Sequence, residues 1–282
     1  MATLVRRVLG QSTVRLNSLS INLDSRETLN ARFRQLRNYS CDMCKAKECP
    51  PITVRSAQLS DFDNIVSFMK ENFLKHDPAC TYLSIPDPPH HALLNHFYEN
   101  LKDGMALLAV EENHCIVGVV INTAVSHWSA NKTIQFADSC LNRPEKDLLK
   151  FYAHIAEGPN IWEKYCVAKV FDCTYLAVKP EWQGKGIAKR LIEESWYLAR
   201  DCAFDIFRFD CTSCYSAKIA KNFGWECIYS LFYNRYVVNK ETIFKNVKEP
   251  HTEVKVFIDL PKFYEDDSLH YGEDCDKRKK NK

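Results

Sequence analysis

The sequence predicts an α/β fold in which strands and helices follow one another along a single domain. Short apolar runs of strand length are interspersed with amphipathic helical segments over residues 52–260. Two of these runs flank a short polar turn, which indicates a hairpin. The 46% of hydrophobic residues is enough to build a full core. No run approaches the roughly 18 apolar residues of a membrane span, so we expect no membrane partner.

In the N-terminal half, the patterns predict three strands and three helices. Ser60, with Asp63 three residues later, resembles a capping box and predicts where the first helix begins. The prolines between Pro78 and Pro89 predict a long loop. The expected strands cover residues 52–55, 106–110 and 115–123, and the expected helices cover residues 62–73, 90–101 and 146–156.

The signals are sharper in the C-terminal half. A long strand is expected over residues 168–178, followed by a strongly amphipathic helix over residues 184–200. A shorter helix over residues 216–223 is predicted to stop at Gly224. The remaining expected strands cover residues 204–211, 226–238 and 254–260.

The two ends of the chain differ from the rest. Residues 1–40 hold seven arginines and only two acidic residues, and this composition, mixed with serine and threonine, is typical of a mitochondrial transit peptide. A disordered leader over residues 1–50 is the alternative. Residues 263–282 are acidic and then basic, which favours a disordered, solvated tail. We therefore expect one folded domain over residues 51–262.

Charge and cysteine content narrow the possible functions. The 38 basic and 36 acidic residues leave a net charge of only +2, which gives no reason to expect a nucleic acid partner. Thirteen cysteines are an odd number, and no signal-peptide core precedes them, so a reducing compartment is expected. The protein is expected in the cytoplasm, with the mitochondrion as the alternative. Cys41, Cys44 and Cys49 lack a fourth zinc ligand at suitable spacing, which predicts unpaired thiols.

Two of only eight glycines, Gly184 and Gly186, stand close together where a strand is followed by a helix. Glycine allows a positive φ and a close approach of the backbone to a ligand. The free N–H groups at a helix start form an anion site, for which a phosphate is the natural ligand. A dinucleotide fingerprint and a P-loop both require glycine where this chain has Lys189. Neither motif is therefore present.

Gln183, Gly186 and Ala188 instead fit the pattern Gln-x-x-Gly-x-Gly/Ala. With it, the segment resembles the pyrophosphate loop of the GNAT superfamily of acetyl-CoA-dependent N-acetyltransferases. The segment Cys211–Trp225 is similar to that family's next strand and helix, and the resemblance extends over about residues 52–260. It implies a mixed, mostly antiparallel sheet with helices on both faces. It also implies acetyl-CoA as the co-substrate and no metal.

Two shorter segments resemble the insect-type arylalkylamine N-acetyltransferases in particular. One is the hydroxyl-rich stretch from Thr212 to Ser216, and the other is Asn72–Pro78. The second is similar to a Phe-Phe-x-Asp-Glu-Pro motif whose second acid is the catalytic base. By position that acid is Asp77, although Asp replaces Glu and His76 replaces the preceding acid. The resemblance implies Asp77 as the base and leaves His76 as the second candidate, while a turn residue before proline is the structural alternative for Asp77.

The resemblance also implies roles for other residues. Thr212 and Ser216, four residues apart and expected to share one helix face, would take part in the chemistry, and Tyr215 would protonate the departing thiolate. Helix capping and packing are their structural alternatives. A main-chain N–H near Val178 would donate to the thioester oxygen. The residues implied to hold acetyl-CoA are Leu176, Ala177, Val178, Gln183, Gly184, Lys185, Gly186, Ile187, Ala188 and Ser216.

We therefore expect a monomeric enzyme that transfers an acetyl group directly to a primary amine. An arylalkylamine such as dopamine, serotonin, octopamine or tryptamine is the first expectation, and Phe73, Phe97, Tyr98 and Trp162 lie in segments available to line an acceptor pocket. One alternative is a GNAT enzyme acting on a polyamine, an amino acid or a protein amine. Another is an acyl-CoA-binding sensor without catalysis.

Overall fold

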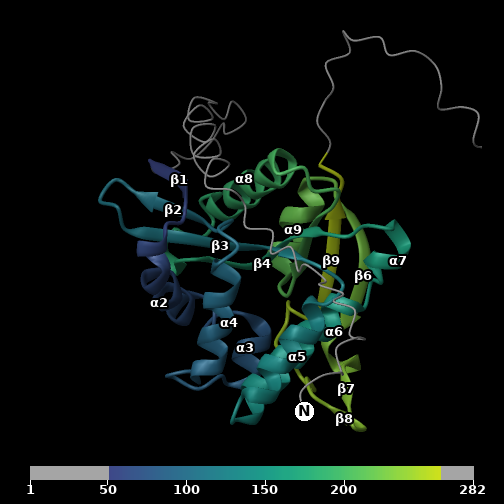
Figure 1. The fold of residues 1–282 in the computed structure, drawn as a ribbon. Helices are drawn as coiled ribbons and strands as arrows, with labels where there is room; N and C mark the ends of the chain where they lie inside the picture. Colours follow the sequence, from purple (N-terminus) through teal and green to yellow (C-terminus); the bar gives the residue numbers. More distant parts are fainter. Residues whose placement is uncertain (1–50, 262–282) are drawn as a thin grey trace, which may run out of the picture. The chain divides into compact units, whose positions relative to one another are not determined.

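In this computed structural model, residues 51–261 are described, and they form a seven-stranded sheet with helices on both faces (Figure 1). The expected leader over residues 1–50, its three cysteines and the expected tail over residues 263–282 lie outside the described residues. Between residues 51 and 261, no helix combines the length and the apolar character needed to cross a membrane.

The sheet is mixed and mostly antiparallel, as expected. Its strand order is β1-β2-β3-β4-β5-β9-β6, and β4 and β5 form the parallel pair. A separate two-stranded ribbon consists of β7 and β8. The strands are β1 (Ile52–Ser56), β2 (Leu107–Glu111), β3 (Ile116–Val125), β4 (Val170–Val178), β5 (Phe207–Cys211), β6 (Glu226–Phe232), β7 (Val237–Val238), β8 (Glu241–Thr242) and β9 (Glu253–Asp259).

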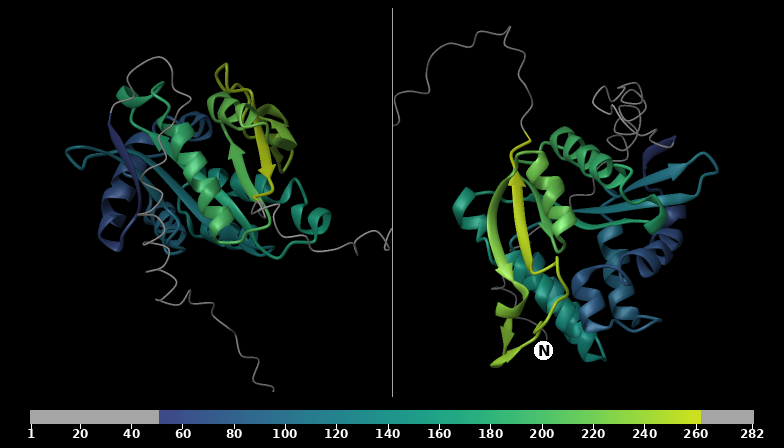
Figure 2. Two further views of the ribbon diagram at one scale, coloured as in Figure 1. Left: turned by 90° about the horizontal axis from the view of Figure 1, so that it is seen from above. Right: turned by 180° about the vertical axis from the view of Figure 1, so that it is seen from behind.

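The helices cover both faces of the sheet (Figures 1 and 2). Helices α2 and α4 pack on β3 on one face, where a hydrophobic cluster joins them to α3, α5 and α6. Helix α8 packs across β2, β3 and β4 on the other face, and α9 packs on β5 and β9. The helices are α2 (Phe62–Asn72), α3 (Pro78–Leu83), α4 (His91–Leu101), α5 (Ser129–Ser139), α6 (Arg143–Glu157), α7 (Ile161–Tyr165), α8 (Ile187–Asp201) and α9 (Cys214–Asn222), with single 3₁₀ turns at Leu59–Asp61, Pro180–Trp182 and Tyr233–Arg235.

Gly118 allows α8 to lie unusually close to β3. A Cβ atom at this position would lie 3.0 Å from both Ile187 Cγ2 and Leu191 Cδ1, which is tighter than ordinary packing. The absence of a side chain therefore fixes the first turns of α8 directly against the sheet. This contact places the start of α8 beside the end of β4.

Two expected features of the N-terminal half were wrong. The proposed loop over residues 78–89 begins with helix α3, because Asp77 caps it and Pro78 occupies its first position, a favoured arrangement at a helix start. Ser60 does not cap the first helix. Gln58 and Asp61 instead form a capping box on the 3₁₀ turn that precedes α2, and the Asp61 carboxylate also pairs with Arg55 at 2.7 Å.

The expected long strand over residues 226–238 is interrupted, and two helices were missed. β6 ends at Phe232, because Tyr233 turns into the core, where it is 1% exposed, and its N–H donates to Thr252. Helix α5 was not predicted, because only Ala130 and Ala137 are buried along it, and two small residues do not produce a clear helical period of hydrophobic residues. The five-residue helix α7 is too short to produce a periodic pattern.

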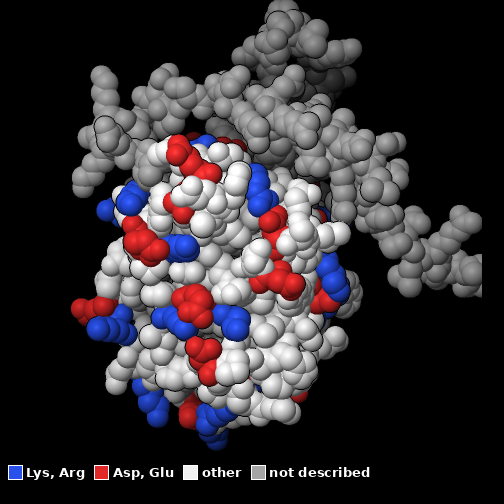
Figure 3. Space-filling view, turned by 90° about the vertical axis from the view of Figure 1, so that its left-hand side faces the viewer, with Lys and Arg blue, Asp and Glu red and all other residues white. Residues whose placement is uncertain are grey.

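Acidic and basic side chains are intermixed on the face that carries β1 and α2 (Figure 3). Charges of one sign do not dominate this face, in agreement with the balanced composition of the chain.

Candidate active site

Two neighbouring strands separate in the middle of the sheet. β4 and β5 pair only between residues Phe171–Cys173 and Phe207–Phe209, although β4 continues to Val178. A cavity of about 1090 Å³ lies where the strands part. Because the gap interrupts the hydrogen-bonded ladder, the cavity is lined by residues from helices on both faces of the sheet.

The two ends of this cavity differ in their walls. The part beside Tyr152 and Ile155 of α6 is called here the α6 side, and the part beside Ile187 and Lys189 of α8 is called the α8 side. Lys218 of α9 also lines the cavity. The α8 side therefore combines a helix start with Lys189, and Lys218 adds a second lysine to the cavity wall.

The open edge of β4 carries main-chain donors. In an antiparallel pair, alternate residues of one strand bond to the same neighbour. The N–H of Lys179 donates to Val117 of β3 at 3.0 Å, so the N–H groups of Val178 and Leu176 point away from β3, toward the side from which β5 has departed. Leu176, Ala177 and Val178 all line the cavity.

The loop between β4 and α8 has the backbone that its glycines predict. Gly184 and Gly186 adopt φ angles of +74° and +82°, and no atom lies within 4 Å of a Cβ built on either residue. The Gln183 side chain donates to the Val178 carbonyl at 3.1 Å and so closes the loop onto the end of β4. No side chain caps the first turn of α8, so its N–H groups are available to an anion.

The expected loop residues do not all face the cavity. Gln183, Gly184, Gly186, Ile187 and Ala188 line it. The Lys185 ammonium instead lies 4.7 Å from the centre of the Trp182 ring.

Asp77 is brought to the cavity from one face of the sheet, and Thr212 comes from the end of β5. The Asp77 Oδ1 accepts the N–H groups of Ala79 and Cys80 at 3.0 and 3.1 Å, and its Oδ2 accepts the Thr212 hydroxyl at 2.5 Å. Burial raises the pKa of Asp77, and these hydrogen bonds oppose the rise. The carboxylate thus caps α3, accepts the Thr212 hydroxyl group and lines the cavity. The neighbouring His76 lines the cavity too, but its side chain is exposed.

The other expected catalytic residues lie at the start of α9, and each lines the cavity. Ser216 belongs to a capping box, in which Ser213 Oγ accepts the Ser216 N–H at 3.1 Å and Ser216 Oγ accepts the Ser213 N–H at 3.3 Å. The structural alternative of helix capping is therefore present at Ser216. Thr212 precedes the cap, so the expectation that Thr212 and Ser216 share a helix face was wrong. Tyr215 is 66% exposed.

His251 is a functional candidate that the sequence did not reveal. Its ring lies 5.2 Å from the Tyr215 ring, and its Nδ1 accepts the Cys214 N–H at 3.2 Å. Burial lowers the pKa of His251, and the negative charge of Asp77 opposes that change. The residue lines the cavity, yet no motif surrounds it, because only the fold of the segment before β9 brings it to α9.

The α6 side of the cavity has an aromatic wall. Its polar centre is Tyr175, which shares a hydrogen bond of 2.9 Å with His96 Nδ1. Burial lowers the pKa of His96 to about 4, so the imidazole is neutral at pH 7. Among the four aromatic residues expected to line an acceptor pocket, Phe73 and Trp162 line the cavity. Phe97 and Tyr98 do not: the first is fully buried in the core, and the second bonds to Asp63 near the surface.

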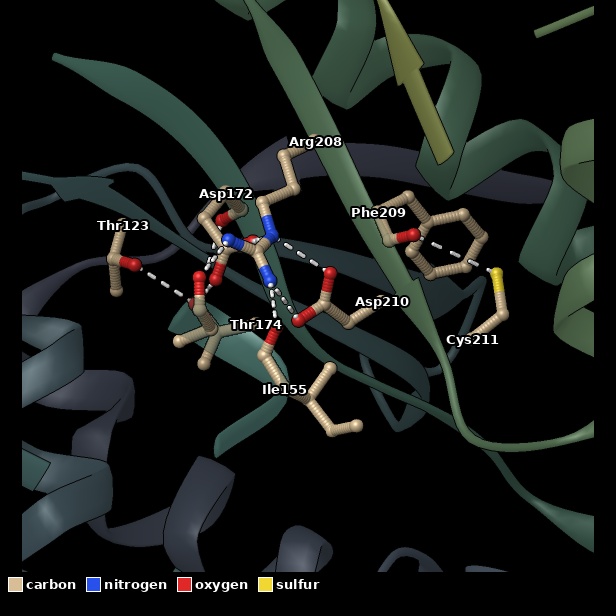
Figure 4. Close-up of polar contacts among 9 residues, drawn as sticks. Thr123, Ile155, Asp172, Thr174, Arg208, Phe209, Asp210 and Cys211 are labelled. Carbon is tan, nitrogen blue, oxygen red and sulfur yellow. Dashed lines mark hydrogen bonds and ion pairs between the residues drawn. The ribbon is translucent and has the colours of Figure 1, made fainter. Parts of the chain in front are cut away.

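A charged cluster was also missed, and it lines the same cavity where β4 and β5 still pair (Figure 4). Arg208 is 2% exposed and forms a bidentate pair with Asp210, with both distances 2.7 Å. Its guanidinium also donates to the carbonyls of Ile155 and Ala156 at the end of α6. Asp172 lies 3.7 Å from the same guanidinium.

Comparison with known proteins gives likenesses to solved structures, whereas no family model matches the chain. The chain resembles arylalkylamine N-acetyltransferase 2 from Aedes aegypti with 24% identity and a TM-score of 0.68, over 74% of this chain and 99% of that one. A Drosophila melanogaster polyamine N-acetyltransferase that forms N-acetylagmatine is 20% identical, with a TM-score of 0.67 over 74% and 100% of the two chains. An agmatine N-acetyltransferase mutant in its apo form is also 20% identical, with a TM-score of 0.67 over 74% and 99%.

These likenesses extend over nearly the whole length of each of the three solved chains. At such identities they establish the architecture and not the substrate. The separated β4 and β5 strands, the glycine loop and the following helix agree with the fold expected from the sequence. The described part of this chain therefore has the GNAT acetyltransferase fold.

Proposed function

We propose that the protein is an acetyl-CoA-dependent N-acetyltransferase acting on a primary amine. The observation that carries this proposal is one cavity that lies where β4 and β5 part, with the uncapped start of α8 on one side and the Asp77 carboxylate in its wall. Such a cavity allows two reactants to meet from opposite faces of the sheet, and the resulting proximity supplies much of the rate enhancement.

The α8 side fits a phosphorylated thioester. The N–H groups of the first turn of α8 and the positive helix dipole suit the pyrophosphate, and Lys189 and Lys218 supply positive charge nearby. Gly184 and Gly186 leave room for the backbone to approach it closely. The N–H groups of Leu176 and Val178 are the donors available to the thioester oxygen as its negative charge develops.

The acceptor amine must lose a proton to react. An alkylamine has a pKa near 10.4, so only about one molecule in a few thousand is neutral at pH 7. Asp77 is the first candidate base because its carboxylate is buried and lines the cavity. Thr212 orients this carboxylate, and Tyr215 is the candidate donor to the departing thiolate. His251, beside Tyr215, is placed to exchange protons with the site.

The acceptor class has two candidates. The wall formed by Phe73, Tyr152 and Tyr175 favours an arylalkylamine, since aromatic rings stack on one another. The carboxylates of Asp172 and Asp210 favour a polyamine, because they place negative charge in the same cavity. The three solved structures described above include enzymes named for each class of amine.

A thiol-release assay tests the proposal. The full chain is incubated with acetyl-CoA and a panel of arylalkylamines, polyamines, amino acids and peptides, and free CoA is measured. Release with arylalkylamines alone supports the first acceptor class, and release with another amine supports the transferase but rejects that class. No release with any acceptor, together with thermal protection of the protein by acetyl-CoA, would support the non-catalytic sensor instead.

Substitution of Gly186 by Ala tests the loop. An alanine held at a φ of +82° is strained, so the free energy of unfolding is expected to fall by about 1–2 kcal/mol. The relaxed loop should also bind acetyl-CoA at least tenfold more weakly, as measured by calorimetry. Gly224→Ala is the matched control, because Gly224 has a φ of +77° and equal space but lies after α9. Gly224→Ala should lower the free energy of unfolding without weakening the binding of acetyl-CoA. An equal loss of affinity for acetyl-CoA in both variants would contradict the assignment of the Gly186 loop to acetyl-CoA binding.

A further inference from the structure

We propose that Asp172 forms a second cation-binding subsite in the cavity, which selects amine acceptors that carry another positive charge far from the reacting nitrogen. This inference rests on the proposed function, since it concerns the acceptor of that reaction. It goes beyond that function by assigning the selection to one side chain.

The Asp172 carboxyl group is buried but incompletely paired. Its residue is 9% exposed and lines the cavity. One oxygen, Oδ2, accepts the Thr174 hydroxyl at 2.9 Å. The other, Oδ1, has no hydrogen-bond donor among the described residues and lies 3.7 Å from the Nε of Arg208, beyond hydrogen-bond distance. A buried carboxylate oxygen without a donor is costly, and it is a strong acceptor for any cation that reaches it. The terminal torsion of aspartate is soft, so the carboxylate of this cavity-lining residue can rotate toward a bound cation.

The surroundings of Asp172 favour a cation over a neutral donor (Figure 4). Asp172 and Asp210 together oppose a single guanidinium, that of Arg208, which is already bound in bidentate fashion by Asp210. The carbonyls of Ile155 and Ala156 at the negative end of α6 occupy further guanidinium donors. When both carboxylates are ionised, the cluster holds a negative charge without a partner. Burial, followed by the charge of Asp210, raises the pKa of Asp172 to about 7.

The strand geometry sets the distance between the two charges of the ligand. Asp172 pairs in register with Arg208 of β5. Thr212, whose hydroxyl donates to Asp77, lies four residues after Arg208, directly beyond the end of β5. Four strand residues span about 13 Å. An amine at Asp77 and a cation at Asp172, each in contact with its carboxylate, are then roughly 7–11 Å apart. An extended chain covers about 1.2 Å per bond, so the two nitrogens are separated by about six to nine bonds.

A matched pair of amines tests the subsite. Pentylamine and 1,5-diaminopentane have the same carbon chain and differ in the second charge. With the full-length protein we expect a kcat/KM at least tenfold higher for the diamine. The selectivity ratio is the kcat/KM of the diamine divided by that of pentylamine. Asp172→Asn should lower this selectivity ratio at least tenfold and leave the kcat/KM of pentylamine within about threefold of the wild-type value. Asp103→Asn is the matched control, because Asp103 lines the same cavity but its Oδ2 accepts the Ala124 N–H. The selectivity ratio of the Asp103→Asn variant should change much less than that of Asp172→Asn.

The possible outcomes separate the subsite from the proposed reaction. A parallel change for both amines in Asp172→Asn, or an equal loss of the ratio in Asp103→Asn, would overturn the subsite and leave the transferase intact. If no amine is acetylated, the proposed function fails, and calorimetry with 1,5-diaminopentane decides the subsite. Binding with release of a proton from the wild type, absent in Asp172→Asn, supports it, and no Asp172-dependent binding overturns it. Asp172→Ser replaces the Asn variant if the latter does not fold.

Discussion

Asp77→Asn is expected to lower kcat by about 10²–10⁴-fold while the affinity for acetyl-CoA stays unchanged. General base catalysis contributes an effect of this size. The asparagine keeps the shape of the side chain, and its amide oxygen can still accept the N–H groups of Ala79 and Cys80 that cap α3. What it loses is the ability to take a proton. Asp77→Ala would also remove the N-cap of α3, so a loss of activity in that variant could come from a loss of stability and not from the missing base.

Two control variants accompany this measurement of CoA release under saturating substrates. Asp61→Asn alters another aspartate at a helix start, one that pairs with Arg55 outside the cavity, and it should not change kcat. His76→Ala tests the second candidate base and should leave kcat within about threefold. Undiminished turnover in Asp77→Asn, or loss of turnover in His76→Ala alone, would remove Asp77 from the role of base.

The parts of the site that were predicted from the sequence are the ones whose residues are neighbours in the chain. The segment from Gln183 to Ala188 contains its own turn residues and helix start, so the positive φ angles of its glycines and the free N–H groups of the helix start follow from the local sequence. The β2–β3 hairpin and α8 were predicted for the same reason, since hydrophobic period and local turns determine them. Asp77 was identified by resemblance to a short motif, and its contact with Thr212 was not foreseen.

The missed parts depend on contacts between distant segments. Asp77 and Thr212 are 135 positions apart, and Arg208 lies 53 positions from Ile155. In the sequence, Arg208 and Asp210 are ordinary polar residues of an expected strand. They form a buried charged cluster only because β5 pairs with β4 and because Arg208 contacts the C-terminal end of α6. His251 reaches Tyr215 for a similar reason, since β9 is inserted between β5 and β6. The local hydrophobic periodicity of the sequence does not predict these contacts between distant segments.

Asp172→Asn is expected to stabilise the protein, and the gain should grow with pH. The pKa of Asp172 is about 7 in the folded protein, compared with the ordinary value of 3.8. The folded state therefore binds the proton more tightly than the unfolded state. This stabilising contribution is fully present below about pH 4 and is lost as the pH rises toward 7. At about 1.4 kcal/mol per pKa unit, the loss reaches up to about 4 kcal/mol at pH 8. The asparagine variant avoids it because its side chain does not ionise.

Urea unfolding at pH 5 and pH 8 measures this difference. The free energy of unfolding of the wild type should fall by about 2–3 kcal/mol more than that of Asp172→Asn between these two pH values. Asp138→Asn, a change at an exposed residue paired with Lys150, should follow the wild type. Parallel pH profiles for the wild type and Asp172→Asn would mean that Asp172 ionises with its ordinary pKa, so that its negative charge beside Arg208 and Asp210 does not destabilise the fold. Asp172→Asn is expected both to be more stable than the wild type and to lose the selectivity for the diamine. The two results together would mean that the same carboxylate destabilises the fold and selects the ligand, which is a trade-off between stability and function at one side chain.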